Sequence, residues 1–543
     1  MKKSILLCVC LALLTTAFLS SCGDSTGNTS SYQYSITEGT DGIDYELNET
    51  GDGYIVTGFK SIDNELIIPE LYEGKPVVEI GESAFEFNEF DKITLPRSLK
   101  KIGKKAFFHL VSYEEDGLDT LIIPEGVEEI GEDAFWFCPF KEITLPSTLK
   151  IIGERAFALN SNLNKFILNE SDYFVVKNNV LYSKDEKELI HYPAGIKKNS
   201  FDVPSTVENI LDYAIYNNPN LTNINFSSNS ELKQIGVYGI ACLTIEQIDL
   251  TILKNLTIIK DFAFSENSLK SITIPETVTS MGEGLFKKNA SLLVAKFNNT
   301  FTALPNRMFE DCYRLTSVTY KNSEQITSIG DNAFKSCGLT KIDFPKNLIL
   351  IGERAYYANK GLTSLSFPSS LQTIGNNAFT YCSNITSIAF PSSLKTIGER
   401  AFVQLELLDN IDLSITKVET IGEVAFLNCS AVKSVSFPKT LKSIGKQAFQ
   451  GLSNIETIAL NEGLESIGEN AFIETSKVYK VYIPKSIKSF GNYVFGSYQQ
   501  NKQTLNLFFE DASFDEVNRI AYGVSDNNVY FNQTLADFTA FTK

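Results

Sequence analysis

The sequence predicts an α/β repeat fold: a solenoid with a continuous parallel β-sheet on one face, short helical turns on the other, and a cap at each end. Three observations lead to this prediction. The phrase Ile-Gly-x-x-Ala-Phe recurs along most of the 543 residues. From Ile329 onward its copies are spaced 22 to 24 residues apart, and periods of about 20–50 residues are typical of stacked repeats. Units such as ITSIAFP at 385–391 also contain a short alternating apolar run that ends at a proline.

The recurring phrase marks about 17 repeats of about 23 residues over residues 80–497. Its first residue is called the anchor below. Ten clear copies have their anchors at Ile80, Ile102, Ile130, Ile152, Ile329, Ile374, Ile397, Ile421, Ile444 and Ile467. Seven weaker copies have theirs at Ile210, Ile235, Ile259, Met281, Leu304, Ile351 and Phe490. No unit can bury its apolar face alone, so each copy repeats the same packing solution.

One unit shows how the elements are predicted. Ile388 and Phe390 alternate with polar or small residues, as in a strand with one buried face, and Pro391 ends that strand because proline cannot donate to a ladder. Gly398 either adopts a backbone conformation that a side chain would forbid or lets neighbouring backbones approach closely. The segment ERAFVQL at 399–405 is predicted to form a helical turn.

The pattern is interrupted in three places. Residues 173–195 contain two alternating apolar runs around a polar tetrapeptide and predict a β-hairpin inserted into one repeat. Residues 112–117, SYEEDG, add an acidic loop. Between 210 and 304 the anchor phrase degrades, which predicts less regular units there.

The segments outside the repeats are predicted to be caps and an export signal. Residues 33–79 and 498–543 lack the phrase but contain strand-like runs, and they are expected to cover the apolar ends of the stack. Residues 1–21 combine two lysines, an apolar run and small residues, as a secretory signal peptide does. Residues 22–32 are polar and predict a flexible tether.

Cys22 is the candidate site of lipid attachment. Leu19-Ser20-Ser21-Cys22 resembles the bacterial lipobox, in which the cysteine is acylated and becomes the new N-terminus. The alternative is an ordinary signal peptide that happens to end at a cysteine. In the lipoprotein interpretation, acyl chains hold the folded part just outside a membrane.

The complete phrase L-x-x-I-x-F-P-x-x-L-x-x-I-G-x-x-A-F-x-x-C resembles the BspA-like (Treponema-type) leucine-rich repeat of bacterial surface proteins, over residues 80–497. The resemblance implies a curved leucine-rich repeat solenoid with a parallel sheet on one face. Residues 33–79 look like the N-terminal cap of this family, and insertions such as 173–195 are common in it. The family also implies adhesion as the function.

Composition and charge exclude several functions. The net charge of −17 repels phosphate backbones, so no nucleic-acid partner is expected. His109 and His191 are the two histidines, and without a clustered partner both are interpreted as surface residues. No phosphate-binding loop, dinucleotide fingerprint or His-Glu-x-x-His motif occurs, so we expect no enzyme activity, no cofactor and no metal site.

Five cysteines lie three residues after the anchor phenylalanine or its equivalent: Cys138, Cys312, Cys337, Cys382 and Cys429. Asn and Leu take the same position in other units, so this is interpreted as a packing position with a buried thiol. Cys312 and Cys337 lie in adjacent units, and a disulfide between them remains the alternative.

Candidate partner contacts come from aromatic residues, because binding hot spots favour Trp, Tyr and Arg. The residues that face outward from the predicted sheet are mostly Ser, Thr and Ala, as at Ser364, Ser366, Ser387 and Ala389. The candidate contacts are Trp136, the hairpin residues Tyr182, His191 and Tyr192, and Tyr482 near the C-terminal end. Trp136 also fits a role in the core or on a ridge.

The favoured function is a lipid-anchored bacterial surface protein that presents a rigid solenoid for protein–protein interaction, with adhesion to host extracellular matrix or plasma proteins or to other cells. A monomer in the cell envelope, exported and exposed at the cell surface, is expected. Two alternatives remain open: an accessory lipoprotein for glycan capture, and a purely structural envelope protein.

Overall fold

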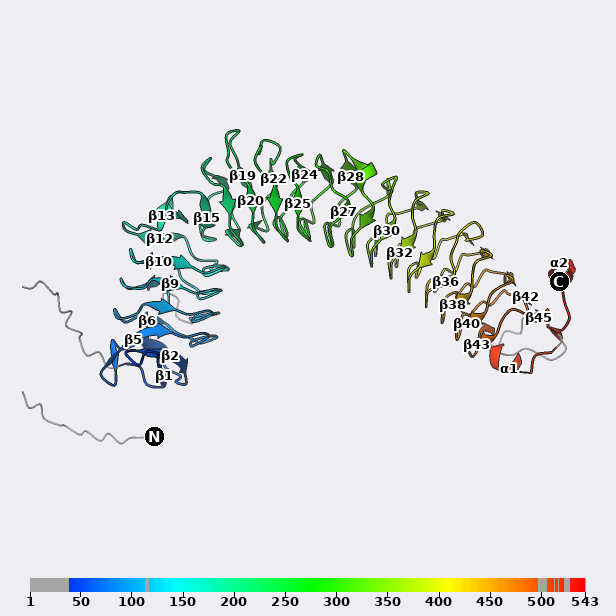
Figure 1. Cartoon of the computed structure of the whole chain (residues 1–543), viewed down its shortest axis with the longest axis horizontal. Coiled ribbons are helices and arrows are strands. Elements are labelled where there is room, and N and C mark those ends of the chain that lie inside the picture. Colours follow the sequence, from blue (N-terminus) through cyan, green and yellow to red (C-terminus); the bar gives the residue numbers. More distant parts are fainter. Residues whose placement is uncertain are drawn as a thin grey trace, which may run out of the picture.

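The computed structural model describes residues 39–112, 117–496, 505–511, 513–515, 517–521 and 528–542, and it forms one curved arch of stacked turns (Figure 1). Each turn of the solenoid, called a rung below, corresponds to one sequence repeat. Cys22, the signal peptide at 1–21, the tether at 22–32 and most of the acidic loop at 112–117 lie outside the described residues. Within the described residues, no helix has the length and apolar character needed to cross a membrane.

The longest ladder joins the short strands that end at the anchors. The ladder has three parts, in this order: β1 (Ile43–Leu47), β2 (Tyr54–Phe59), β5 (Lys75–Ile80) with β4 (Leu71–Tyr72), β7 (Lys101–Ile102), β9 (Glu129–Ile130), β11 (Ile151–Ile152); then β13 (Phe174–Lys177), β14 (Val180–Ser183), β15 (Glu188–His191), β17 (Asn209–Ile210), β20 (Gln234–Ile235), β23 (Ile258–Ile259), β25 (Ser280–Met281); then β27 (Ala303–Leu304), β29 (Ser328–Ile329), β30 (Leu350–Ile351), β32 (Thr373–Ile374), β34 (Thr396–Ile397), β36 (Thr420–Ile421), β38 (Ser443–Ile444), β40 (Ser466–Ile467), β43 (Ser489–Phe490). The strands of the regular rungs pair in parallel, for example Ile374 with Ile397, whereas β1–β2, β4–β5 and β13–β14–β15 are antiparallel.

The strands predicted from the alternating apolar runs form a second parallel row, but this row is not the continuous sheet that the sequence predicts. It is divided into sheets of two to four strands: β3 (Glu65–Ile67), β6 (Lys92–Thr94); β8 (Thr120–Ile122), β10 (Glu142–Leu145), β12 (Lys165–Leu168); β16 (Ser200–Asp202), β19 (Asn223–Asn225), β22 (Gln247–Ile248); β24 (Ser271–Ile274), β26 (Val294–Phe297), β28 (Ser317–Tyr320); β31 (Ser364–Ser366), β33 (Ser387–Ala389); β35 (Asn410–Asp412), β37 (Ser434–Ser436); β39 (Thr457–Ala459), β42 (Lys480–Ile483), β45 (Asn506–Phe509), β46 (Val529–Tyr530).

The remaining elements are short. Two further pairs join β18 (Ile215–Tyr216) to β21 (Ile240–Ala241) and β41 (Phe472–Ile473) to β44 (Phe495–Gly496). Helical structure among the described residues is confined to a 3-10 turn at Ser323–Gln325, α1 (Val517–Ile520) and α2 (Leu535–Ala540).

The helical turn predicted after each anchor is absent from the described rungs. The seven residues that start at the anchor Gly, called the corner below, alternate their hydrogen bonds instead. The N–H groups of Arg400, Phe402 and Gln404 donate to the carbonyls of residues 423, 425 and 427 in the next rung, at 2.8–2.9 Å. Arg400 and Gln404 have left-handed backbones with φ of 54° and 58°, which turns alternate N–H groups along the solenoid axis and away from a helical partner.

The anchor glycines are required by the close approach of adjacent rungs. A Cβ on Gly422 would lie 2.7 Å from the Gly398 carbonyl carbon and from the Glu399 nitrogen, both backbone atoms that cannot move aside. Gly398 and Gly422 do not adopt positive φ, so the structure favours close backbone approach over a special conformation.

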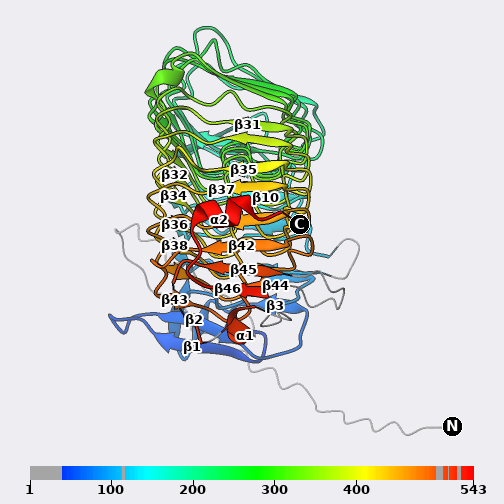
Figure 2. The same cartoon turned by 90° about the vertical axis from the view of Figure 1, so that its right-hand side faces the viewer.

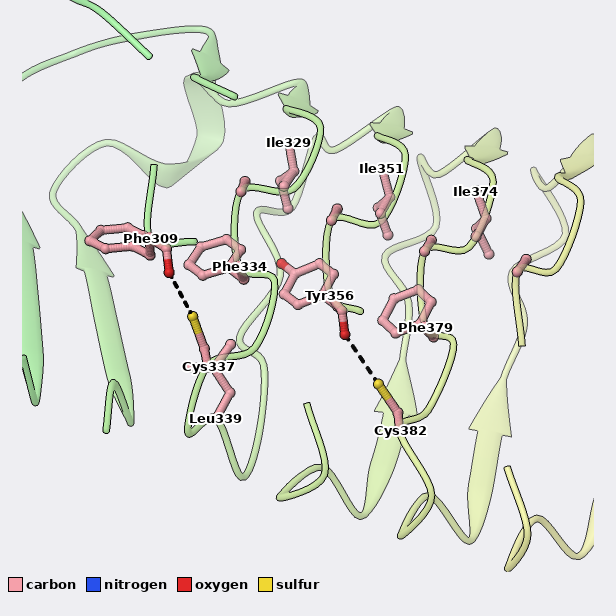
Figure 3. Close-up of a cluster of buried hydrophobic side chains, with 14 of the residues drawn as sticks. Phe309, Ile329, Phe334, Cys337, Leu339, Ile351, Tyr356, Ile374, Phe379 and Cys382 are labelled. Carbon is pink, nitrogen blue, oxygen red and sulfur yellow. Dashed lines mark hydrogen bonds between the residues drawn. The ribbon is translucent and has the colours of Figure 1, made fainter. Parts of the chain in front are cut away.

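Inside the arch, each rung places its anchor and its phenylalanine above those of the preceding rung. Figure 3 shows this for Phe309, Phe334, Tyr356 and Phe379, whose rings stack at centroid distances of 5.1–5.4 Å. The cysteines continue the pattern: the Cys382 thiol donates to the Tyr356 carbonyl at 3.2 Å. Asn359 takes the same position one rung earlier, and its amide donates to the Phe334 carbonyl at 2.7 Å.

All the cysteines of the described residues are free and buried. The Cys312 thiol donates to Phe286 at 3.0 Å and the Cys337 thiol donates to Phe309 at 3.1 Å, so no disulfide joins these two residues. The interpretation of this cysteine position as a packing position is therefore confirmed for Cys312 and Cys337. Both thiols also donate to a buried carbonyl.

The inserted segment 173–195 divides the core. β13, β14 and β15 are antiparallel, whereas β15 pairs in parallel with β17 and returns the chain to the ladder. The buried apolar side chains accordingly form two large clusters, one that extends from Tyr54 to Leu181 and one from Val180 to Ala521.

The two ends of the arch differ. At the N-terminal end, Ile43, Tyr45 and Phe59 of the antiparallel β1–β2 pair pack against the first core cluster. Near the C-terminal end, α2 lies over the outward face of β42 and β45 (Figure 2), where Phe538 packs on Tyr482 and Phe508.

The donor role of the cysteine position predicts different outcomes for two substitutions. Cys382→Ala removes one of two side-chain donors to the buried Tyr356 carbonyl, which still accepts from the Asn359 amide at 2.8 Å, and is expected to destabilise the protein by about 1 kcal/mol. Cys382→Asn supplies the amide that Asn359 uses one rung earlier and is expected to cost clearly less. Urea unfolding followed by circular dichroism measures both, and equal losses would show that the donor is unimportant.

Candidate functional site

Four of the predicted contact residues are buried. Tyr182, Tyr192, His191 and Tyr482 are only 2–6% exposed. The interpretation of His191 as a surface residue is therefore wrong, and none of the four can reach a partner without a rearrangement. The hairpin packs its aromatic side chains into the solenoid because the inserted strands continue the ladder. Tyr482 does face outward from its strand, but α2 covers it.

His191 takes the place of a core phenylalanine. Its ring lies 6.3 Å from Phe157, the last member of the column Phe85–Phe107–Phe135–Phe157, and 5.8 Å from Phe166. The Nε2 atom is buried and has no hydrogen-bond partner among the described residues. Burial disfavours the charged imidazolium and lowers the pKa of His191 to about 4.

Trp136 is the predicted contact that remains accessible, as a half-buried side chain on a corner. Its ring is stacked with Phe108 of the preceding rung at 6.3 Å and meets Tyr213 edge-on at 5.5 Å. Trp136 and Tyr213 are far apart in sequence because the insertion lies between them. Their contact therefore bridges the interruption in the solenoid.

Arg155 lies beside both rings, with its guanidinium carbon 6.0 Å from the Trp136 centroid and 5.8 Å from the Tyr213 centroid. The same guanidinium donates to both carboxylate oxygens of Asp133, at 2.8 and 2.7 Å, and to Glu132 at 2.6 Å. These carboxylates raise the pKa of Arg155 further above its usual range, Asp133 contributing most. The result is a rigid Trp–Arg–Tyr group at the surface.

An aromatic strip extends from this group along the corners in both directions. We call it the corner ridge, and it comprises Phe87, Phe108, His109, Trp136, Phe137, Tyr213, Tyr216, Tyr238 and Phe262. Phe87 and Phe137 are 62% and 45% exposed, and the other members are half-buried. His109 stacks on Phe137 at 4.5 Å.

Sequence reasoning found one member of the ridge and missed the others. Phe108 and Trp136 are both five residues after their anchor Gly, and Phe87, His109 and Phe137 are six residues after it. Equivalent positions in later rungs carry residues such as Val403 and Gln404. The signal was therefore present as a run of aromatic residues at fixed corner positions, but the corners were expected to be helical turns.

The site suits binding and offers no clear chemistry. Among the residues that the structure describes, no group of three or more His, Cys, Asp or Glu side chains could hold a metal ion. The ridge concentrates Trp, Tyr and Arg, the residue types that dominate binding energy at interfaces. The outward positions of β31, β33, β35 and β39, in contrast, carry exposed Ser, Thr and Ala side chains, together with Asn410 and Asp412 of β35.

A family model described as "BspA type Leucine rich repeat region (6 copies)" matches this chain over residues 78–199, 191–316, 234–360, 302–432 and 407–516. The chain is also similar to solved structures of bacterial leucine-rich repeat proteins. A leucine-rich repeat protein from Bacteroides ovatus is 19% identical over 91% of this chain and 98% of its own, with a TM-score of 0.46. One from Eubacterium ventriosum is 22% identical over 66% of this chain and 91% of its own, with a TM-score of 0.42.

A leucine-rich cell surface protein from Faecalibacterium prausnitzii is 17% identical over 94% of this chain and 98% of its own, with a TM-score of 0.32. No curated protein matches the chain.

His191 predicts a pH dependence that can be measured. A folded pKa of about 4 against about 6.5 in the unfolded chain means that the unfolded state binds the proton first as the pH falls. The contribution of neutral His191 to the free energy of unfolding is intact above about pH 6.5 and is lost as the pH falls from about 6.5 to 4. Between pH 7.5 and 5, the native chain should lose about 2 kcal/mol more stability than His191→Phe. Unfolding midpoints at both pH values test this, and parallel losses in the two proteins would contradict it.

Proposed function

Because the chain belongs to the BspA-type leucine-rich repeat family, we propose that it binds protein partners at the bacterial cell surface through the corner ridge. Proteins of the host extracellular matrix or plasma, or of other cells, are the proposed partners, and adhesion is the proposed role. The family is suited to protein–protein interaction, and its fold is typically a non-catalytic scaffold.

The single observation that supports this proposal is the Trp–Arg–Tyr group at the centre of the ridge. Trp136 and Tyr213 present large rings, and the Asp133 and Glu132 carboxylates hold Arg155 beside them. Preorganised side chains lose little conformational entropy on binding. Weaker contacts along the rest of the arch would add affinity through multivalency.

Lipid attachment at Cys22 is part of the proposal. It would place a monomeric solenoid in the cell envelope, tied to a membrane by acyl chains on the polar tether at 22–32. The β1–β2 pair at one end and residues 498–543 at the other are proposed to act as caps, because each end of the stack would otherwise expose apolar side chains.

Glycan capture is the second candidate, because a specific observation favours it. Phe87 and Phe137 expose rings on the ridge, and flat aromatic faces are the platforms on which sugar rings stack. A glycan array distinguishes the two functions: binding of sugars that Phe87→Ala and Phe137→Ala abolish would favour glycan capture. If the protein were a purely structural envelope protein, it would bind neither protein partners nor glycans.

The ridge predicts the effect of one substitution on partner capture. Trp136→Ala removes a central ring and is expected to weaken a captured protein's affinity by about 10–100-fold. The matched control is Tyr357→Ala, since Tyr357 is a half-buried ring five residues after Gly352, the corner position equivalent to Trp136, in a rung outside the ridge. The experiment presents the full chain in detergent to serum and matrix proteins, then measures affinity by biolayer interferometry. Equal affinities for the two variants would overturn the assignment.

Acylation makes a separate prediction. Cells that express the chain with radiolabelled palmitate should label the native protein, whereas Cys22→Ala should remain unlabelled and be released from the membrane fraction. Undiminished labelling of the variant would contradict lipid attachment at Cys22. Because the ridge lies far from residue 22 in the sequence, either proposal can fail without the other.

A further inference from the structure

The inserted segment leaves one rung without its corner. In a regular rung the core ring follows the anchor by five residues, as Phe157 follows Ile152. In the rung that the insertion supplies, Leu189 occupies the anchor position, since it pairs with Ile210, and His191 reaches Phe157 only two residues later. The chain therefore takes a short cut that is three residues shorter than a regular corner.

The short cut leaves a cavity of about 170 Å3 at the surface, which we call the notch. The notch is lined by residues 152–158 of the preceding rung, by Ile190 and His191, by residues 211–213 of the following rung, and by Lys260. Tyr213 belongs to the corner ridge and Arg155 lies beside its ring, so the notch opens next to the ridge.

The notch leaves backbone donors unused. In regular corners the residues two, four and six after the anchor Gly donate to the next rung, as Arg400, Phe402 and Gln404 do. The equivalent donors of the rung before the notch are the N–H groups of Arg155, Phe157 and Leu159. These three N–H groups have no hydrogen-bond partner in the part of the chain that the structure describes.

The geometry of the regular corners defines what would satisfy these donors. Phe402 and Gln404 donate to carbonyls of residues 425 and 427, two positions apart on one chain. Carbonyls two positions apart on an extended peptide point to the same side and are spaced by about 6.6–6.8 Å. A regular corner presents its acceptors on a path that contains left-handed residues such as Val424, whereas an extended peptide presents alternate carbonyls on one side, so it can accept from the free N–H groups by adding to an exposed backbone edge.

Local charge defines the side chains of such a peptide. Glu154 and Asp212 line the notch and Glu132 and Asp133 lie behind Arg155, against the cations Arg155, Lys260 and Lys104, which pairs with Glu132 at 2.8 Å. Arg155 is engaged by Asp133 and Glu132, and Lys260 lies 3.2 Å from Asp212. Glu154 keeps 69% of its side chain exposed and lies 4.0 Å from Arg155. The charge that remains to be balanced is negative, which favours a basic side chain on the peptide.

We propose that the notch is a binding site for an extended peptide segment that carries Lys or Arg. Its carbonyls accept hydrogen bonds from the N–H groups of Arg155 and Phe157, and a side chain enters the cavity. The basic side chain reaches the exposed carboxylate of Glu154. This site goes beyond the proposed function, because it assigns a defined polypeptide chemistry to a site distinct from the aromatic surface.

Hydrogen exchange of the full chain in detergent, without peptide, first tests whether the N–H groups at the notch are unbonded. The backbone amides of Arg155, Phe157 and Leu159 should exchange at least about 10-fold faster than those of Arg400, Phe402 and Gln404, whose N–H groups are bonded to the next rung. Comparable protection of the two segments would overturn the proposal, because it would mean that the donors at the notch are already satisfied.

Peptide binding is tested with acetylated and amidated dodecapeptide arrays that differ in a fixed central Lys or Glu. The Lys array should yield the tighter binders, and the best peptide should change the fluorescence of Trp136, the single tryptophan of the chain. The bound peptide should slow exchange at residues 155–159 and leave residues 400–404 unchanged. A preference for the Glu array, the absence of any binder, or binding without local protection would each overturn the proposal.

Two matched variants separate the notch from the ridge. Ile190→Phe enlarges a half-buried side chain that lines the notch and should weaken the peptide at least 10-fold. Ile151→Phe makes the same change at a 55% exposed position one residue outside the lining, and it should bind as the native chain does. Equal peptide affinity of the two variants would overturn the proposal that the peptide binds in the notch. The proposed function is tested separately. If the Ile190→Phe variant still captures a protein partner that Trp136→Ala no longer captures, the proposed function holds although the notch does not.

Discussion

The close contact between the backbones of successive rungs is the constraint on which this structure depends. At the anchors the rungs lie so near that a single Cβ on Gly422 would collide with two backbone atoms of the rung before it. At the corners, left-handed residues turn alternate N–H groups toward the next rung. A rung therefore satisfies its polar backbone only when the neighbouring rung has the same path, which explains why the sequence repeats.

The same constraint places the side chains. Once the backbones are in register, every anchor Ile and every corner Phe lies above its equivalent, as in the column of Phe309, Phe334, Tyr356 and Phe379 (Figure 3). The Phe334 and Tyr356 carbonyls accept hydrogen bonds from the side chains of Asn359 and Cys382, one rung further along. Residues of different chemistry, Leu405 among them, occupy this position because the shared requirement is a buried side chain of suitable size.

Specific features arise where a rung departs from this regular path. The insertion at 173–195 replaces a corner with a short cut, which puts His191 into an aromatic column and leaves the N–H groups of Arg155 and Phe157 without partners. It also brings Trp136 beside Tyr213 across the interruption. The regular rungs with their small outward residues act as a scaffold, and the irregular rungs hold the side chains suited to recognition.

The repeat phrase alone was sufficient to predict a stacked solenoid, the strands of the alternating runs and the burial of Cys382, because these follow from periods and residue types within one unit. It did not reveal that the corners are not helical, since that depends on N–H groups whose acceptors lie about 23 residues away on another rung. Nor could it place Tyr482 under α2, His191 in the core or Trp136 against Tyr213. Each of these depends on contacts between segments far apart in the chain, which form only when the rungs are stacked.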